Sequence, residues 1–297
     1  MTKKNRFKVK KENSFDDSLY LSYWKIFNIS LFGRGMSEVL KMVECWIKSE
    51  AKGKWIATVN PEFVMKATEN DDFRSLLKET DLNVVDGVGL LWAREVENRF
   101  RKYDLRFMNK TLKMLTGLKV GGEIVAGKHR QGLVSGADLM PELCKLASEK
   151  GYKVFFLGGF GDRAKRTAEY FEQRFKKNDL RFKNSYSPGE PEIANSEVIK
   201  KINSFKPDIL FVAYGMKKQE EWIKSNRNKA DFGVAIGVGR CFDYYSGDLR
   251  RAPKLIRKMG MEWLYSLIKE PKRFKRQLVL PKFILKVLYN YIWKREE

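Results

Sequence analysis

Short apolar runs alternate with helix-like periods along most of the chain. The runs that predict strands are Trp24–Ser30, Trp55–Asn60, Leu82–Asp86, Lys153–Leu157, Ile209–Tyr214 and Phe232–Ile236. Helical periods lie between most of them, chiefly at 37–51, Ala137–Lys150, Arg163–Lys177, Ser196–Phe205 and Lys217–Asn226. Strands that are apolar throughout and alternate with helices are typical of a parallel sheet covered on both faces. The pattern therefore predicts an α/β fold of this kind.

Two segments depart from this rhythm. Residues 97–135 are rich in Lys and Arg, and we expect an amphipathic helix around Leu105–Leu118 followed by a loop with glycines. From residue 250 the sheet pattern ends and the chain becomes helical, basic and aromatic. The predicted organisation is a basic flexible tail at 1–20, a core at 21–249 with an insert near 97–135, and a helical appendage at 250–297.

The charge of the chain predicts an anionic partner. Lys and Arg total 59 against 37 Asp and Glu, which gives a net charge of +22. Nucleic acid, an anionic membrane surface and phosphate-bearing substrates would all fit such an excess. The basic residues gather in the tail, the insert and the appendage, where residues 250–276 hold ten basic and two acidic residues. They do not gather on a sheet face or on a helix that could contact bases, so we expect no nucleic-acid partner.

Cysteine and histidine usage restricts the chemistry. The three cysteines are widely spaced and the only histidine, His129, sits in a polar stretch. A disulfide framework or a histidine-rich metal site is therefore not expected, and neither is a bound cofactor. If the chain is an enzyme, its acid and base are carboxylates. No Asp-x-Asp pair is present, so Arg or Lys would have to stabilise a diphosphate leaving group without a metal.

Polar residues and glycines follow the predicted strands, where open parallel sheets bind their ligands. Thr58 and Asn60 close one strand, and Asp86 closes the next, directly before Gly87. Asp86 could instead cap the following helix. The turn that contains Gly158 and Gly159 leads into a helix, where amide groups and the helix dipole favour phosphate. Gln219 follows a later strand, and Asp243 is a possible acceptor for ribose hydroxyls.

The motifs in combination resemble those of the WecG/TagA/CpsF glycosyltransferase family. They come in the family's order over about residues 26–280, as Thr58-Val59-Asn60, Val85-Asp86-Gly87-Val88-Gly89, Gly136-Ala137-Asp138-Leu139, Leu157-Gly158-Gly159, Pro207-Asp208-Ile209-Leu210, Lys218-Gln219-Glu220-Glu221-Trp222, Gly237-Val238-Gly239, Phe242-Asp243, Arg251-Ala252-Pro253, Glu262-Trp263-Leu264-Tyr265 and Glu270-Pro271-Lys272-Arg273-Phe274-Lys275-Arg276. Each motif alone is weak, but the combination is specific.

The resemblance implies a Rossmann-like core and an inverting, metal-independent sugar transfer. The implied donor is a UDP-sugar, typically UDP-N-acetylmannosamine, and the implied acceptor is undecaprenyl-diphosphate-linked N-acetylglucosamine in cell-surface polysaccharide or teichoic acid synthesis. Asp86 matches the family's general base, with Thr58 and Asn60 beside it. Residues expected to bind substrate are Gly87, Gly158, Gly159, Gln219, Asp243, Arg251, Arg273 and Arg276.

Three positions depart from the family pattern. Lys217 stands where Pro is usual, Arg240 where a second Gly is usual, and Ser266 where an Arg follows the Glu-Trp-Leu-Tyr motif. Arg240 or Arg257 would be the replacement for that arginine. Two alternatives therefore stay open: a different UDP-sugar donor, or a non-catalytic family member that acts as a scaffold.

The segment Leu278–Trp293 suggests where the protein works. Lys282 and Lys286 share one helical face, and apolar residues fill most of the remainder. Such a helix can lie in a membrane interface, or it can pack on the core or on another subunit. No apolar run approaches the length of a membrane span. We expect a cytoplasmic protein, peripheral on the inner face of the plasma membrane, and the sequence leaves a homo-oligomer open.

Overall fold

The computed structural model describes residues 22–102, 109–175, 182, 184–188 and 195–292. The side chains of Lys102, Asn184, Arg273, Tyr291 and Ile292 are outside this description, as is the predicted tail at 1–20.

One mixed sheet forms the centre of the molecule. Its strands are β1 (Tyr23–Ile26), β2 (Ile29–Phe32), β3 (Lys54–Val59), β4 (Leu82–Val85), β5 (Val154–Gly158), β6 (Asn184–Tyr186), β7 (Ile209–Ala213) and β8 (Val234–Gly237). Their order is β1-β2-β4-β3-β8-β7-β5-β6, and every pairing is parallel except that of β1 with β2. The predicted parallel sheet is therefore confirmed. The carboxyl ends of β3, β4, β7 and β8 meet near its middle.

The first predicted strand, Trp24–Ser30, is a hairpin instead. β1 and β2 pair antiparallel, and the two residues between them, Phe27 and Asn28, have φ values of +46° and +66°. Positive φ at both central residues is the geometry that reverses two twisted strands tightly, and Asn tolerates it well. The turn contains neither Gly nor Pro, so Asn28 is the one residue in it that favours a turn.

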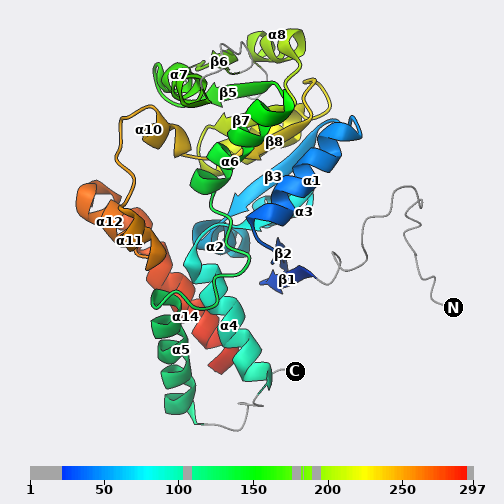
Figure 1. Cartoon of the computed structure of the whole chain (residues 1–297). Coiled ribbons are helices and arrows are strands. Elements are labelled where there is room, and N and C mark those ends of the chain that lie inside the picture. Colours follow the sequence, from blue (N-terminus) through cyan, green and yellow to red (C-terminus); the bar gives the residue numbers. More distant parts are fainter. Residues whose placement is uncertain (1–21, 103–108, 176–181, 183, 189–194, 293–297) are drawn as a thin grey trace, which may run out of the picture.

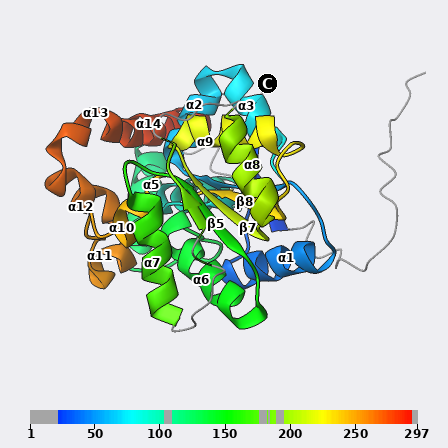
Figure 2. The same cartoon turned by 90° about the horizontal axis from the view of Figure 1, so that it is seen from above.

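Helices cover both faces of the sheet, as predicted (Figures 1 and 2). One face is covered by α1 (Met36–Lys48), α6 (Gly136–Lys150), α7 (Arg163–Phe175) and α10 (Cys241–Tyr245), and the other by α2 (Pro61–Glu69), α3 (Asp71–Lys78), α4 (Val88–Lys102), α8 (Ser196–Phe205) and α9 (Met216–Asn226). Within β3, Trp55 and Ala57 belong to one core and Ile56 to the other, because successive strand residues face opposite sides.

The insert folds as a helix that packs on α4. This helix, α5, spans Lys110–Val125 and so continues beyond the predicted end at Leu118, while residues 105–108 of the prediction lie outside the described part. Trp92 Nε1 of α4 donates a hydrogen bond to the Gly117 carbonyl at 2.9 Å. Arg99 and His129 both pair with Glu123 near the end of α5. The insert is therefore a packed part of the molecule.

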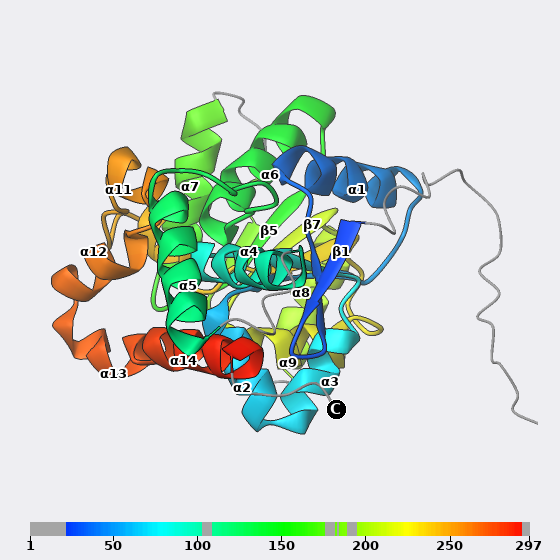
Figure 3. The ribbon, with the colours of Figure 1, turned by 90° about the horizontal axis from the view of Figure 1, so that it is seen from below.

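The appendage is a string of helices that returns to the core. It comprises α11 (Lys254–Lys258), α12 (Glu262–Lys269), the 3₁₀ turn η4 (Pro271–Arg273), α13 (Phe274–Gln277) and α14 (Val279–Ile292). Figure 3 shows α14 lying beside α4 and α5. Phe283 and Val287 of α14 are fully buried in the core that α2 and α4 share with the sheet. Within the described ranges, no helix is both long and apolar enough to span a bilayer.

Candidate active site

A cavity of ≈ 750 Å³ opens at the carboxyl ends of β3, β4, β7 and β8. The appendage forms one of its walls through Trp263, Val279 and Leu280. Of the residues predicted to form the site, those lining it are Thr58, Asn60, Asp86, Gly87, Gly159, Gln219, Asp243, Arg251 and Arg276. Gly158 does not line it, and the side chain of Arg273 is outside the described part. The fold thus gathers most predicted residues around one space.

Asp86 lies at the base of this cavity, directly after β4. Its amide donates to the Val59 carbonyl at 2.7 Å, and its carboxylate accepts from the Gly136 amide at 3.5 Å. Burial raises the pKa of the Asp86 carboxyl to about 7, opposed by the Gly136 hydrogen bond and increased further by the charge of nearby Glu262. A carboxyl group with this pKa can accept a proton at neutral pH and is a stronger base than an ordinary aspartate.

Thr58 and Asn60 lie beside Asp86 but have local partners of their own. The Thr58 hydroxyl donates to the Gly237 carbonyl at 2.8 Å and so ties β3 to the end of β8. The Asn60 side chain accepts hydrogen bonds from the amides of Glu62 and Phe63, which makes it the N-cap of α2. Capping, the alternative considered for Asp86, is thus seen at Asn60.

Gln219 is buried and shapes the floor of the cavity. Its Oε1 accepts from the Gly239 amide at 2.9 Å, and its Nε2 donates to Glu220 Oε1 at 2.9 Å. Glu220 in turn accepts from Trp55 Nε1 at 2.7 Å, and burial raises its pKa to about 7. A Cβ atom at Gly237 would come within 2.3 Å of Glu220. The loop after β8 is therefore held by buried side chains of α9.

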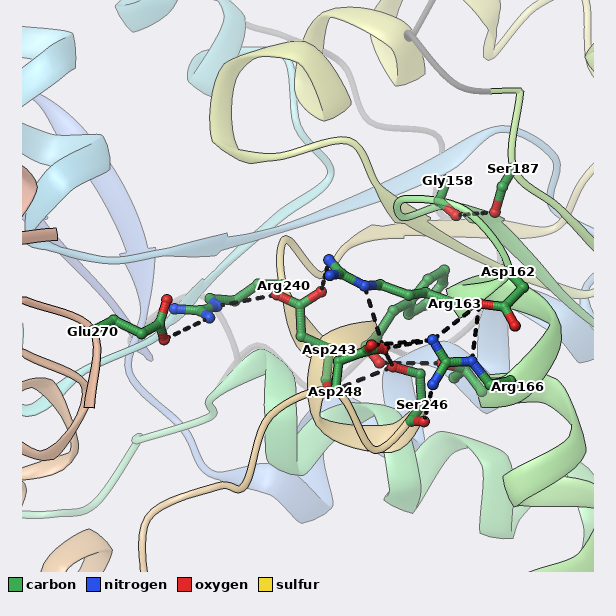
Figure 4. Close-up of polar contacts among 12 residues, drawn as sticks. Gly158, Asp162, Arg163, Arg166, Ser187, Arg240, Asp243, Ser246, Asp248 and Glu270 are labelled. Atoms are coloured by element: carbon green, nitrogen blue, oxygen red, sulfur yellow. Dashed lines mark hydrogen bonds and ion pairs between the residues drawn. The ribbon is translucent and has the colours of Figure 1, made fainter. Parts of the chain in front are cut away.

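Asp243 takes part in an ionic chain rather than facing the cavity unpaired. Its Oδ1 accepts from Arg163 at 2.8 Å and its Oδ2 from Arg240 at 3.3 Å, and Arg240 also pairs with Glu270 at 2.8 Å. Figure 4 shows this chain running from Glu270 to Arg163 and on to Asp248. It links the appendage to α10 and to the start of α7.

The glycine turn after β5 adjoins this chain. Gly158 and Gly159 have φ values of +97° and +73°, which only glycine adopts readily. The Gly158 carbonyl accepts a hydrogen bond from Ser187 Oγ at 2.7 Å, whereas Gly159 borders the cavity. Only the second glycine therefore reaches the space where a ligand would lie.

Arg251 and Arg276 of the appendage are each held by a carboxylate of the core. Arg251 bonds both oxygens of Asp138, at 2.6 and 3.0 Å, and also reaches Glu262 at 3.0 Å. Arg276 pairs with Glu62 of α2 at 2.7 Å. These ion pairs fasten the appendage across the cavity and place guanidinium groups at its wall.

Two further residues contribute polar atoms that lack partners. Tyr214 Oη and Arg240 Nη1 are buried and have no hydrogen-bond partner among the described residues, and both residues border the cavity. Tyr214 directly follows β7, so its place at a strand end could have singled it out. The sequence pointed to Arg240 as a departure from a glycine and, together with Arg257, as a possible replacement for the arginine missing at Ser266. Buried polar atoms without partners are where a ligand gains most from hydrogen bonding.

Comparison with known proteins places the chain in a family. The sequence model described as "Glycosyl transferase WecG/TagA/CpsF family" matches residues 24–115 and 116–297. The chain is 27% identical over 254 residues to a Bacillus spizizenii protein, covering 85% of this chain and 86% of the relative. It is 29% identical over 253 residues to a Staphylococcus aureus protein, covering 84% and 87%.

Both relatives are named N-acetylglucosaminyldiphosphoundecaprenol N-acetyl-beta-D-mannosaminyltransferase. The parallel sheet and the cavity at its carboxyl edge agree with the family match, which covers nearly the whole chain. This chain is a glycosyltransferase and belongs to the WecG/TagA/CpsF family.

Proposed function

We propose that the chain transfers N-acetylmannosamine from a UDP-sugar to undecaprenyl-diphosphate-linked N-acetylglucosamine. The names of the two relatives supply the sugar and the acceptor. The observation that carries the proposal is the position of Asp86 at the base of a cavity bordered by Arg240, Arg251 and Arg276. A base that faces several cations suits a reaction in which a hydroxyl loses a proton and a diphosphate leaves.

The proposed reaction is a single displacement with inversion. The acceptor hydroxyl oxygen attacks the anomeric carbon of the donor while Asp86 takes the hydroxyl proton. The bond from the anomeric carbon to the diphosphate oxygen breaks, and UDP leaves with the electron pair. The raised pKa of Asp86 supports this role because a general base works best with a pKa near the working pH.

Arginine side chains take the charge of the leaving diphosphate in this proposal, without a metal. Arg251 and Arg276 approach from the appendage, and Arg240 approaches from the end of β8 with Nη1 still unpartnered. Guanidinium groups bind phosphate oxygens in a bidentate manner and stay charged. Arg240 thereby compensates for Ser266, which lines the same cavity at the position where the family usually has arginine.

The nucleoside end of the donor is proposed to lie near Gly159 and Asp243. The turn at Gly159 allows close approach, and Asp243 can still accept hydrogen bonds through lone pairs that its two arginine partners leave open. The side-chain nitrogen and oxygen of Gln219 both bond within the protein, so its role in substrate binding includes positioning the loop at Gly239. The membrane-embedded acceptor enters from the side of the appendage, which places the enzyme peripherally on the inner membrane face.

The test is a panel of UDP-sugars with a short-chain lipid-diphosphate N-acetylglucosamine acceptor, run with wild type and Asp86→Asn. We expect turnover with UDP-N-acetylmannosamine, unchanged by a metal chelator, and a loss of at least about 100-fold in the variant. Equal turnover by both proteins would contradict the role of Asp86 as general base. Preference for another UDP-sugar would contradict the proposed donor. No turnover with any donor would favour the scaffold alternative.

A further inference from the structure

Exposed apolar side chains are concentrated in two parts of the molecule. Among the described residues, seventeen large apolar side chains are exposed, and fourteen of them belong to α5 or to the segment after residue 250. Those of α5 are Leu112, Met114, Leu115, Leu118 and Val125. Isolated exposed apolar residues are ordinary, but a contiguous group of them marks an interaction surface.

Helix α5 is apolar on both of its sides. Gly117, Val120 and Ile124 face inward and are buried, at the spacing expected for one helical face. The opposite side exposes Leu115 by 53% and Leu118 by 71%. A helix on the surface of a water-soluble protein ordinarily presents polar residues outward, so the outer face of α5 requires a partner.

Helix α5 packs against α14. Leu288 of α14 packs so closely on α5 that a Cβ atom at Gly117 would approach it to 3.2 Å. Beyond this contact, α14 exposes Ile284, Leu285 and Tyr289. Figures 1 and 3 show α5 and α14 together at the end of the molecule that projects away from the sheet. Two packed helices thus bring their exposed apolar side chains to the same end.

Basic residues accompany these apolar side chains, and the acidic charge nearby is neutralised. α5 carries Lys110 and Lys119 at its surface, while its third lysine, Lys113, is buried on the inner side. The stretch 274–292 carries Lys275, Arg276, Lys282 and Lys286 without any acid. The one acid of α5, Glu123, is engaged by Arg99 and His129. An apolar face edged by lysines fits an anionic bilayer, where apolar groups enter the interface and lysines meet the lipid phosphates.

We propose that α5 is a membrane-docking element, with Leu115 and Leu118 inserted into the interface of an anionic bilayer beside α14. Val279 and Leu280 at the start of α14 line the cavity wall, so docking through α14 and α5 would bring the cavity close to the lipid. The insert is then a second anchor in addition to the appendage. The proposal rests on the proposed function only for the lipid nature of the acceptor, since binding to a bilayer needs no catalysis.

The test measures binding of the full chain to phosphatidylglycerol-containing vesicles and to pure phosphatidylcholine vesicles. Wild type is expected to bind the anionic vesicles, less so in high salt. The variant Leu115→Ser/Leu118→Ser should bind about tenfold or more weakly, because two leucines no longer leave water. It should retain its melting temperature and its turnover of a short-chain, water-soluble acceptor, because neither leucine lines the cavity.

A charge reversal on each end of the molecule provides the matched control. Lys119→Glu on α5 should weaken vesicle binding, whereas Lys200→Glu on α8 changes the net charge equally and should not. Unaltered binding by the double serine variant would overturn the proposal. So would a wild-type dimer that the serine variant converts to monomer, since the surface would then join two copies of the chain. A chain that binds vesicles through α5 but transfers no sugar would refute the proposed function alone.

Discussion

At the scale of single residues, the surroundings of Asp86 determine what it can do. A free aspartate is almost fully ionised at pH 7 and only weakly basic. Within the cavity, burial disfavours the charged carboxylate, and the nearby carboxylates of Glu262 and Asp138 disfavour it further. The residue type is written in the sequence, but this environment is created by three segments that the fold brings together.

The raised pKa of Asp86 predicts the pH dependence of the reaction. The base must be deprotonated to act, so kcat/KM should rise with pH up to about 7 and then level off, if no other group limits the rate. Initial rates between pH 5 and 9 under subsaturating donor would check this. An acidic limb centred near pH 4 would contradict the environment described for Asp86.

Arg240 offers a second test at this scale. If its unpartnered Nη1 meets the diphosphate, Arg240→Gln should lower kcat/KM by about 10- to 100-fold through loss of a charged hydrogen bond. Arg240→Lys should recover only part of the loss, since an ammonium group cannot bond Asp243, Glu270 and a phosphate in the same geometry.

The control for Arg240 is Arg166, another arginine of the ionic chain shown in Figure 4. Arg166 bonds Asp162 and Asp248 outside the cavity, so Arg166→Gln should change kcat/KM by less than about twofold. Equal effects of the two glutamine variants would show that the ionic chain matters only as a scaffold.

At the scale of elements, the sequence pattern located the buried strands but not the edges of the sheet. β3, β4, β5, β7 and β8 are apolar runs covered on both faces, and such runs are easily recognised. β6 has only three residues, Asn184–Tyr186, and no apolar run marks it. The turn at Phe27 and Asn28 contains neither Gly nor Pro, so the pattern predicts one strand where the structure has the β1–β2 hairpin.

The ion pairs that hold the appendage should differ in strength. The Arg251 side chain is only 16% exposed and bonds two carboxylates, so Arg251→Met should lower the free energy of unfolding by roughly 2–3 kcal/mol, because Glu262 loses its arginine and Asp138 keeps only Arg257 and Ser135. The Arg276 side chain is 46% exposed, so Arg276→Met should cost less than about 1 kcal/mol. Chemical denaturation of both variants would measure this, and equal losses would contradict the ranking.

At the scale of the whole molecule, the candidate site combines segments far apart in the chain. Order along the sequence suggested that Thr58, Asp86, Gln219 and Asp243 follow strands, and the parallel sheet puts strand ends together. The ion pairs between side chains could not be predicted in the same way. Nothing in the sequence shows that Asp138 holds Arg251, that Glu62 holds Arg276, or that Asp243 is bonded by two arginines.

Core and appendage should unfold as one unit because α14 completes the core. Phe283 is 1% exposed among residues of α2, α4 and the sheet, so Phe283→Ala should lower the free energy of unfolding by about 3–5 kcal/mol. Leu285 on the same helix is 66% exposed, and Leu285→Ala should cost less than about 1 kcal/mol.

Circular dichroism and tryptophan fluorescence during denaturation would follow this transition. In each protein the two probes should give coincident curves, and the midpoint should be lower in Phe283→Ala, as expected from a single cooperative unit. A separate early transition assigned to the appendage, with an unchanged later one, would show that α14 is an independent module.

If α14 binds lipid as proposed, its double role makes the bilayer a ligand of the native state. One side of this helix is buried with Phe283 and Val287, and the other exposes Ile284 and Leu285. Lipid that binds the outer side can do so only while the inner side holds the helix in place. By mass action, each tenfold increase in lipid beyond the dissociation constant should then add about 1.4 kcal/mol to the free energy of unfolding. Binding to the membrane would thus stabilise the folded enzyme.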